Sequence, residues 1–121
     1  MKLLCFDIPL PGASPESYRP HLQDEARQGW QLYKRGIVRD IYFRQTRPDQ
    51  ARPGPARPGQ ARPGVAIIAE CDSVEAARQA LREFPLAEAG LIDWEVIPLG
   101  PFLGWEMLFA ARRITRHSYS K

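Results

Sequence analysis

Residues 80–101, ALREFPLAEAGLIDWEVIPLGP, decide the fold of this chain. Leu81 and Phe84 close the apolar stripe of a helix, and Pro85 stops that helix because proline lacks the amide hydrogen that the helix ladder uses. Gly90 then allows a turn, and residues 92–98 form a strand. A helix, a short turn and a strand this close in sequence pack as one unit. Earlier segments must therefore supply the strands that pair with the last one.

Three earlier segments have strand patterns. Residues 2–8 (KLLCFDI) and 37–45 (IVRDIYFRQ) alternate between two faces, and residues 65–71 (VAIIAEC) are apolar almost throughout. Proline or glycine flanks each segment, as is typical of strand ends. The chain is therefore predicted to contain four strands.

A helix is predicted between the first two strands. Ser14 offers an N-cap, whereas Pro20 indicates either an irregular start or a true start near Tyr18. Gly36 is a natural C-terminal stop. The predicted buried stripe of this helix is Leu22, Ala26, Gly29 and Tyr33. The second helix is predicted to bury Val74, Ala77, Leu81 and Phe84.

The order strand-helix-strand-strand-helix-strand predicts an α+β, ferredoxin-like βαββαβ fold. Right-handed crossovers place both helices on one face of a four-stranded antiparallel sheet. The other face lacks cover although it is expected to carry apolar side chains, namely Leu3, Ile68, Tyr42 and Ile97. A second copy of the chain would bury that face, so we expect a homodimer.

Residues 1–111 are expected to form a single domain. Residues 47–64 contain the repeat ARPGP-ARPGQ-ARPG, whose prolines and glycines cannot join a sheet. It is interpreted as an expanded loop of the hairpin between the second and third strands, with an arginine-rich docking arm as the alternative. Residues 102–109 are too apolar to lie free in water and are expected to pack on their own domain or on a partner subunit. Residues 112–121 form a basic tail.

The net charge of +3 is unevenly distributed. Residues 47–64 carry +3 and residues 112–121 carry +4, so the rest of the chain carries −4. Because the basic charge lies outside the predicted compact part and no recognisable motif accompanies it, we expect no nucleic-acid partner. No apolar run is long enough to span a bilayer and no secretory signal is evident, so we expect no membrane partner and a cytoplasmic location. Cys5 and Cys71 fit reduced cytosolic thiols, and their spacing is not that of a metal site.

Arg39 breaks the pattern of its own strand. It alternates with Ile37, Ile41 and Phe43 on the face assigned to the helices, where an unpaired guanidinium would be costly. Glu25 and His21, one turn apart on the first helix, border the apolar stripe and could both point toward Arg39. A catalytic site and a structural Arg39–Glu25 pair at the edge of the core are the two interpretations.

Other polar and aromatic residues are secondary candidates. Trp30, Tyr33 and Trp94 could line a substrate-binding pocket, and the alternative for both tryptophans is the core. Acidic residues are expected on the uncovered sheet face, as interface carboxylates paired with Arg44. They are Asp7, Asp40, Glu70, Asp93 and Glu95.

Two short motifs carry a family resemblance. Residues 80–101 contain a helix, a Pro-Leu stop and a closing strand with a hydrophobic-Glu-Val sequence. An Asp24-Glu25 pair is followed, after ten residues, by Gly36, and Arg39 lies three residues further on. The chain thereby resembles the muconolactone isomerase-like branch of the dimeric α/β-barrel superfamily, apart from Asp40, where these isomerases carry histidine.

The resemblance implies a dimeric α/β barrel and a small cofactor-independent enzyme. Such an enzyme would shift a proton next to a carbonyl on a lactone or polyketide-like acid, a reaction that needs one base and one cation but no metal. Glu25 is the expected base, His21 its competitor, and Arg39 the anion-binding group. The alternatives are a non-catalytic dimeric module that binds a small ligand or accompanies an enzyme, and a cofactor-free monooxygenase or cyclase of the same superfamily.

Overall fold

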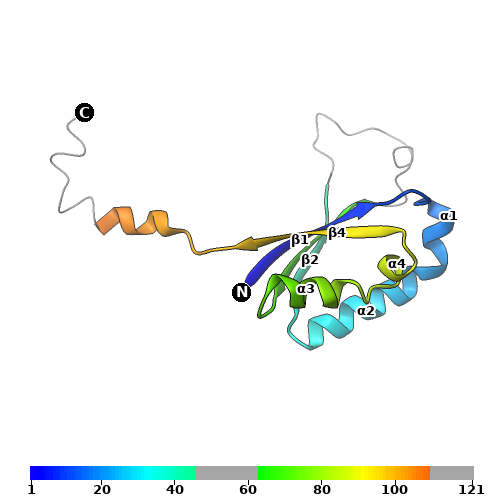
Figure 1. Ribbon diagram of the computed structural model, residues 1–121, viewed down its shortest axis with the longest axis horizontal. Coiled ribbons are helices and arrows are strands. Elements are labelled where there is room, and N and C mark those ends of the chain that lie inside the picture. The colour runs from blue at the N-terminus through cyan, green and yellow to red at the C-terminus, as the bar shows by residue number, and fades with distance from the viewer. Residues whose placement is uncertain (46–62, 110–121) are drawn as a thin grey trace.

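The computed structural model describes residues 1–45 and 63–109. In chain order the elements are β1 (Lys2–Pro9), α1 (Pro15–Tyr18), η1 (Arg19–His21), α2 (Leu22–Lys34), β2 (Val38–Phe43), β3 (Val65–Glu70), α3 (Val74–Leu81), α4 (Pro85–Glu88), β4 (Ile92–Leu99) and η3 (Leu103–Glu106). The strands form one antiparallel sheet in the order β2-β3-β1-β4. The helices α2 and α3 lie on one face of this sheet (Figure 1). The predicted ferredoxin-like α+β fold is confirmed.

The segment that was expected to decide the fold does form one packed unit. Leu81 ends α3, and both Leu81 and Phe84 are buried. Pro85 does more than stop the helix, because it is the first residue of the short helix α4, where its missing amide hydrogen costs nothing. Gly90 has a φ of +76°, which glycine adopts readily, and it turns the chain into β4.

The first helix has the irregular start that Pro20 indicated. Ser14 caps α1 through a reciprocal pair of hydrogen bonds with Ser17, and Pro20 lies in the 3-10 turn η1 before α2 begins. Gly36, with a φ of +80°, follows the C-terminus of α2. The segment therefore consists of α1, η1 and α2 instead of one long helix, and Pro20 lies in the 3-10 turn between the two helices.

The core lies between the sheet and the helices. Leu3, Cys5, Ile67 and Leu86 are 0% exposed. The assignment of Leu3 to the uncovered face was wrong: Leu3 pairs with Ala69 on the helix side of the sheet. Leu4 is next along the strand, points to the opposite face, and pairs with Ile68 and Ile97. The uncovered face bears Leu4, Phe6, Ile8, Tyr42, Ile68, Ile97 and Leu99.

Arg39 lies at an irregularity in β2. Val38 pairs with Ala69, but the next pair is Asp40 with Ile68, so Arg39 is the extra residue of a β-bulge. Val38 thereby joins the helix side of the sheet, where it is 1% exposed, and Arg39 is exposed. The predicted alternation was wrong for Val38, which it placed on the other face with Asp40 and Tyr42. Arg39 keeps the side of Ile41 and Phe43, where it borders a hollow beside α2, but it is not buried as expected.

The apolar segment after β4 does not pack on its own domain. The turn η3 is directed away from the sheet (Figure 1), and the large side chains of residues 102–109 are 60–71% exposed. Of the two expected packings, the structure does not show the one within the domain, and packing on a partner subunit stays a prediction. The repeat, apart from Pro63 and Gly64, and the basic tail lie outside the described residues.

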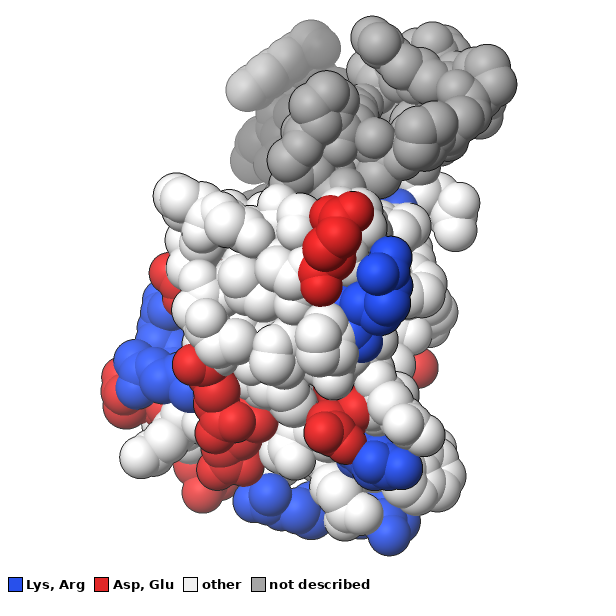
Figure 2. Space-filling model, turned by 90° about the vertical axis from the view of Figure 1, so that its right-hand side faces the viewer, with Lys and Arg blue, Asp and Glu red and all other residues white. Residues whose placement is uncertain are grey.

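Charged side chains of both signs are interspersed over the end of the molecule where α1 lies (Figure 2). They surround uncharged surface and form no single acidic or basic field on that face. Within residues 1–45 and 63–109, no helix has the length and apolar character needed to cross a membrane.

Candidate functional site

A cavity of about 730 Å³ lies between α2 and the sheet. The helix contributes one side of it, with Leu22, Glu25, Ala26, Gly29, Trp30 and Tyr33. The strands contribute the other, with Ile41, Tyr42, Phe43, Val65, Ile67 and Trp94. Phe84, the residue before α4, completes the lining. A largely apolar, aromatic wall with few polar groups is typical of small-molecule sites.

The predicted buried stripe of the first helix lines this cavity instead of packing on the sheet. Leu22 is 40% exposed and Tyr33 is 52% exposed, although both lie on the helix side that faces the strands. The residues of α2 that are buried are Glu25 and Leu32. The apolar pattern therefore predicted the correct side of the helix, but this side borders open space over much of its length.

Glu25 is the one carboxylate among the described residues that line the cavity. Its side chain is 6% exposed, and its Oε1 accepts a hydrogen bond of 2.9 Å from the backbone N–H of Leu86 in α4. A buried carboxylate is stable only when hydrogen bonds compensate for its lost hydration, and this bond supplies one of them. The contact between α2 and α4 thus fixes a potential base in an apolar wall.

Two aromatic pairs shape the cavity. Trp30 stacks on Tyr33 with ring centroids 5.4 Å apart, and Trp30 is 57% exposed at the cavity mouth. Phe84 and Trp94 pack deeper, with centroids 5.6 Å apart. Trp94 is therefore both a core residue and part of the wall, whereas Trp30 is not in the core. The Nε1 donor of Trp94 is buried and has no hydrogen-bond partner in the described part of the chain.

The structure does not bring His21 or Arg39 into this lining. His21 is half-buried at the N-cap of α2, and it is not among the residues that border the cavity. Arg39 borders a second, smaller hollow of about 330 Å³, together with Tyr33, Lys34, Gly36 and Val38. Tyr33 lines both hollows, so the cationic side chains of Lys34 and Arg39 lie next to the mouth of the main cavity.

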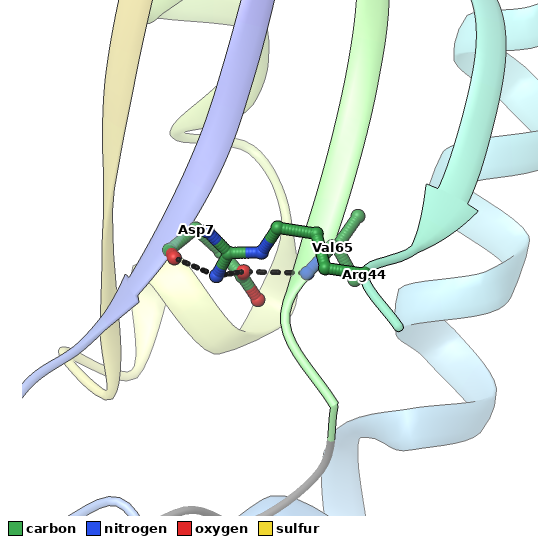
Figure 3. A network of polar contacts seen from close by, with 3 residues as sticks. All are labelled: Asp7, Arg44 and Val65. Atoms are coloured by element: carbon green, nitrogen blue, oxygen red, sulfur yellow. Dashed lines mark hydrogen bonds and ion pairs between the residues drawn. The ribbon is translucent and has the colours of Figure 1, made fainter. Parts of the chain in front are cut away.

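A polar network near the cavity connects β1 with β3 and with Arg44, the residue after β2 (Figure 3). Asp7 is 4% exposed, and its Oδ1 accepts a 2.7 Å bond from the N–H of Val65 and lies 3.4 Å from the guanidinium of Arg44. The same guanidinium donates to the backbone carbonyl of Asp7 at 3.1 Å. The predicted pairing with Arg44 is confirmed for Asp7, but Asp7 alternates with Leu3 and Cys5 on the helix side, so its assignment to the uncovered face was wrong.

The Cys5 thiol is unreactive at neutral pH. Burial, helped by the neighbouring charge of Cys71, raises the pKa of the Cys5 thiol to about 11, so Cys5 stays protonated at neutral pH. A protonated, buried thiol is a poor nucleophile. Among the described residues, no group of three or more His, Cys, Asp or Glu side chains is placed to hold a metal ion.

Sequence reasoning identified Glu25, Trp30, Tyr33 and Trp94, all of which border the cavity. It missed the contribution of Ile41 and Phe43, which were assigned to the core. Alternating apolar residues in an edge strand are the only sequence signal for this role, and core strands give the same signal.

Comparison with known proteins supports the fold. No family model matches the chain, and no curated protein matches it. Among solved structures, the chain is similar to 5-chloro-2-hydroxyhydroquinone dehydrochlorinase (TftG) from Burkholderia phenoliruptrix AC1100, in complex with 2,5-dihydroxybenzoquinone. The TM-score is 0.61 and the identity is 14%, over 86% of this chain and 98% of that one. At this identity the similarity shows a shared fold.

Proposed function

We propose that the chain is a small cofactor-independent enzyme that moves a proton next to a carbonyl on a lactone or other ring-shaped organic acid. The observation that carries the proposal is a single carboxylate, Glu25, fixed in the aromatic wall of a cavity of about 730 Å³. A base held close to an apolar ligand can take a proton from carbon without competition from bulk water.

The reaction has two proton transfers. Glu25 takes the proton from the carbon next to the carbonyl, and the electron pair of the broken C–H bond moves onto the carbonyl oxygen to give an enolate. Where a C=C bond of the ring is conjugated with the enolate, the protonated Glu25 returns the proton at the far carbon of that bond, the C=C bond shifts by one position, and the carbonyl is restored. His21, the competing base, lies outside the cavity lining, which favours Glu25.

An anionic ligand has two places for polar contact. Lys34 and Arg39 border the second hollow, so a carboxylate placed beyond Tyr33 would be held by their charge. The buried Nε1 of Trp94 lacks a partner in the described part of the chain, and an acceptor that reached it would relieve the cost of an unpaired donor, about 1–3 kcal/mol. The muconolactone isomerase-like resemblance implies the same class of ligand, and the similar dehydrochlorinase was solved with a carbonyl-bearing ring.

The substitution Glu25→Gln tests the proposal. Glutamine keeps an oxygen for the N–H of Leu86 but cannot accept a proton, so the fold should survive. With muconolactone as the probe, we expect the wild-type protein to exchange deuterium from solvent into the ring at the carbon conjugated with the carbonyl through the C=C bond, measured by proton NMR. Glu25→Gln should lower that rate by roughly 10²-fold or more.

Ligand affinity in the same samples supplies the control. Glu25→Gln should bind muconolactone within about threefold of wild type, whereas Arg39→Met should weaken binding by roughly 10-fold because one charge-assisted contact is lost. Exchange that is equally fast in Glu25→Gln would exclude Glu25 as the base.

A non-catalytic ligand-binding module is the second candidate. The exposure of Arg39 and the position of His21 outside the lining favour it, because the described residues that line the cavity then include a base but no cationic side chain. Tight binding of muconolactone or 2,5-dihydroxybenzoquinone by the wild-type protein, without any deuterium exchange, would support this function instead.

A further inference from the structure

The chain carries an exposed apolar arm after β4. The side chains of this arm, defined as residues 102–109, are 60–71% exposed, and they are Phe102, Leu103, Trp105, Met107, Leu108 and Phe109. Within the arm, Phe102 packs edge-on against Trp105 with ring centroids 5.2 Å apart. Six large apolar side chains exposed within one eight-residue segment mark an interaction site.

The mouth of the cavity is a second exposed apolar surface. Its lip, defined as the exposed side chains of α2 and β2 on the helix side of the sheet, consists of Trp30, Tyr33, Ile41 and Phe43, which are 49–57% exposed. Strand β2 is an edge strand, so no neighbouring strand shields it. A ligand in the cavity would therefore remain open to water on this side.

The arm does not cover the lip of its own chain. The arm leaves the sheet from β4, and the lip lies on β2, at the opposite edge of the order β2-β3-β1-β4. Only Gly100 and Pro101 separate the end of β4 from Phe102, and the arm is directed away from the helices and sheet (Figure 1). These two residues span at most about 7 Å, whereas three inter-strand spacings of about 4.8 Å separate β4 from β2, so the arm begins far from the lip.

We propose that the arm of one copy covers the aromatic lip of the cavity on a second copy, so that each site is completed by the partner chain. The proposal rests on the cavity being the ligand site of the proposed function. In a symmetric dimer, each chain covers the lip of the other with its arm, so two arms are buried. Six side chains with about two-thirds of their surface exposed would bury on the order of 600 Å² per arm. Together with the surfaces they cover, two arms reach the roughly 1,200–2,000 Å² of a stable interface.

Cross-linking between two differently tagged chains tests the contact without any ligand. One chain carries Leu108→Cys on the arm and the other Tyr33→Cys on the lip, both with Cys71→Ser so that the buried Cys5 is the remaining native thiol. Mild oxidation should join the two tags into one species of about twice 13.8 kDa.

Two control positions give the outcomes that overturn the proposal. Gln79→Cys, exposed on the outer side of α3, should not couple to the arm, and neither should Ile97→Cys on the uncovered sheet face. Coupling of Leu108→Cys to Ile97→Cys in preference to Tyr33→Cys would place the arm on the sheet. Coupling to neither position would exclude an exchanged arm.

A binding measurement tests whether the arm matters to the site. The double variant Trp105→Ser/Phe109→Ser should bind 2,5-dihydroxybenzoquinone about 10-fold more weakly, with an unchanged far-UV circular dichroism spectrum, because both residues are exposed in the separate chain and its fold does not depend on them. Unchanged affinity would show that the arm does not complete the cavity. If the arm and the lip cross-link but the wild-type protein binds no ring ligand, the inference holds and the proposed function fails.

Discussion

Glu25 illustrates how one residue can serve both the fold and the chemistry. Its Oε1 satisfies the N–H of Leu86 at the start of α4, a helix whose preceding residue offers no side-chain cap. The same carboxylate faces a cavity whose other described lining residues carry no acidic group. A structural role therefore holds the group in place, and the proposed chemical role uses that fixed position.

Asp7 offers a prediction about stability at the residue scale. Its carboxylate is the acceptor for the buried N–H of Val65, so Asp7→Ala should leave that donor unpaired and lower the free energy of unfolding by about 2–3 kcal/mol. Arg44 is 43% exposed, and its pair with Asp7 is screened by water. Arg44→Met should therefore cost less than about 1 kcal/mol. Urea unfolding of both variants measures the difference, and equal losses would contradict this ranking.

Cys5 predicts a loss of stability at alkaline pH. The thiol ionises near 9.0 in the unfolded chain and at about 11 in the fold, because burial disfavours the thiolate. Between these values the folded state keeps a proton that the unfolded state has released, so its contribution is complete below pH 9 and falls as the pH rises toward 11. At pH 10.5 this effect should reach about 2 kcal/mol.

The measurement compares urea unfolding at pH 8 and pH 10.5 in the wild-type protein and in Cys5→Ala. The variant is less stable at pH 8 because of the cavity that it creates, but it should lose about 2 kcal/mol less between the two pH values. An equal decrease in the free energy of unfolding between pH 8 and pH 10.5 in the two proteins would show that Cys5 does not titrate as described.

Val38 shows where prediction at the residue scale fails, because it lies on the helix side of the sheet and not on the face that alternation assigned to it. Alternation along β2 predicts side-chain faces correctly as long as the pairing register is regular, and one extra residue reverses every assignment on one side of it. The bulge between Val38 and Asp40 has no marker such as glycine in the sequence. Glu25 lies on a helix without such an irregularity, and this is why its position could be predicted.

Helix α2 gives the corresponding lesson at the scale of elements. Its apolar spacing correctly indicated which side faces the sheet, because that spacing follows from the helical repeat. Periodicity carries no information about the distance between two faces, so it could not distinguish a packed core from a cavity. The exposed Leu22 and Tyr33 therefore belong to the lining, a role that only the position of β2 relative to α2 reveals.

The connection between β2 and β3 allows a prediction about the repeat. Phe43 pairs with Val65, and the N–H of Arg44 donates to the carbonyl of Gly64, so the two strands are in register up to Arg44 and Gly64. Replacing residues 45–63 by Asn-Gly should close a two-residue hairpin in the same register. The shorter loop loses less entropy on folding, and the variant should be as stable as wild type or up to about 2 kcal/mol more stable.

Thermal melting and urea unfolding of the shortened chain test this expectation. A matched control keeps the loop length but replaces each arginine of residues 47–62 by glutamine, so that a contribution of charge is separated from one of length. Loss of folding in the shortened chain, or a large loss of stability in the glutamine control, would show that the repeat makes contacts that stabilise the domain.

At the scale of the whole molecule, the order of elements determined the fold. Strands and helices of this length and sequence leave few arrangements that respect right-handed crossovers, and residues 80–101 fixed the last crossover. The direction of residues 102–109 could not be inferred in the same way. An apolar pattern shows that a segment needs cover, but it does not show whether the same chain or another one provides it.

The uncovered sheet face predicts a homodimer. Ile68 pairs with Leu4 near the middle of that face, where Ile97 and the 60% exposed Tyr42 also lie. A second copy would remove these side chains from water, and a charge at Ile68 would oppose this. Light scattering should give about twice 13.8 kDa for the wild-type protein at micromolar concentration, and about 13.8 kDa for Ile68→Glu.

Two comparisons identify which surface holds the copies together. Gln79→Glu, on the outer side of α3, adds the same charge at an exposed position and should remain dimeric. If Ile68→Glu remains dimeric while Trp105→Ser/Phe109→Ser becomes monomeric, the exchanged arms alone hold the dimer and the sheet face is not the interface. A wild-type protein of 13.8 kDa would exclude both surfaces, because each of them requires a second chain for its apolar side chains.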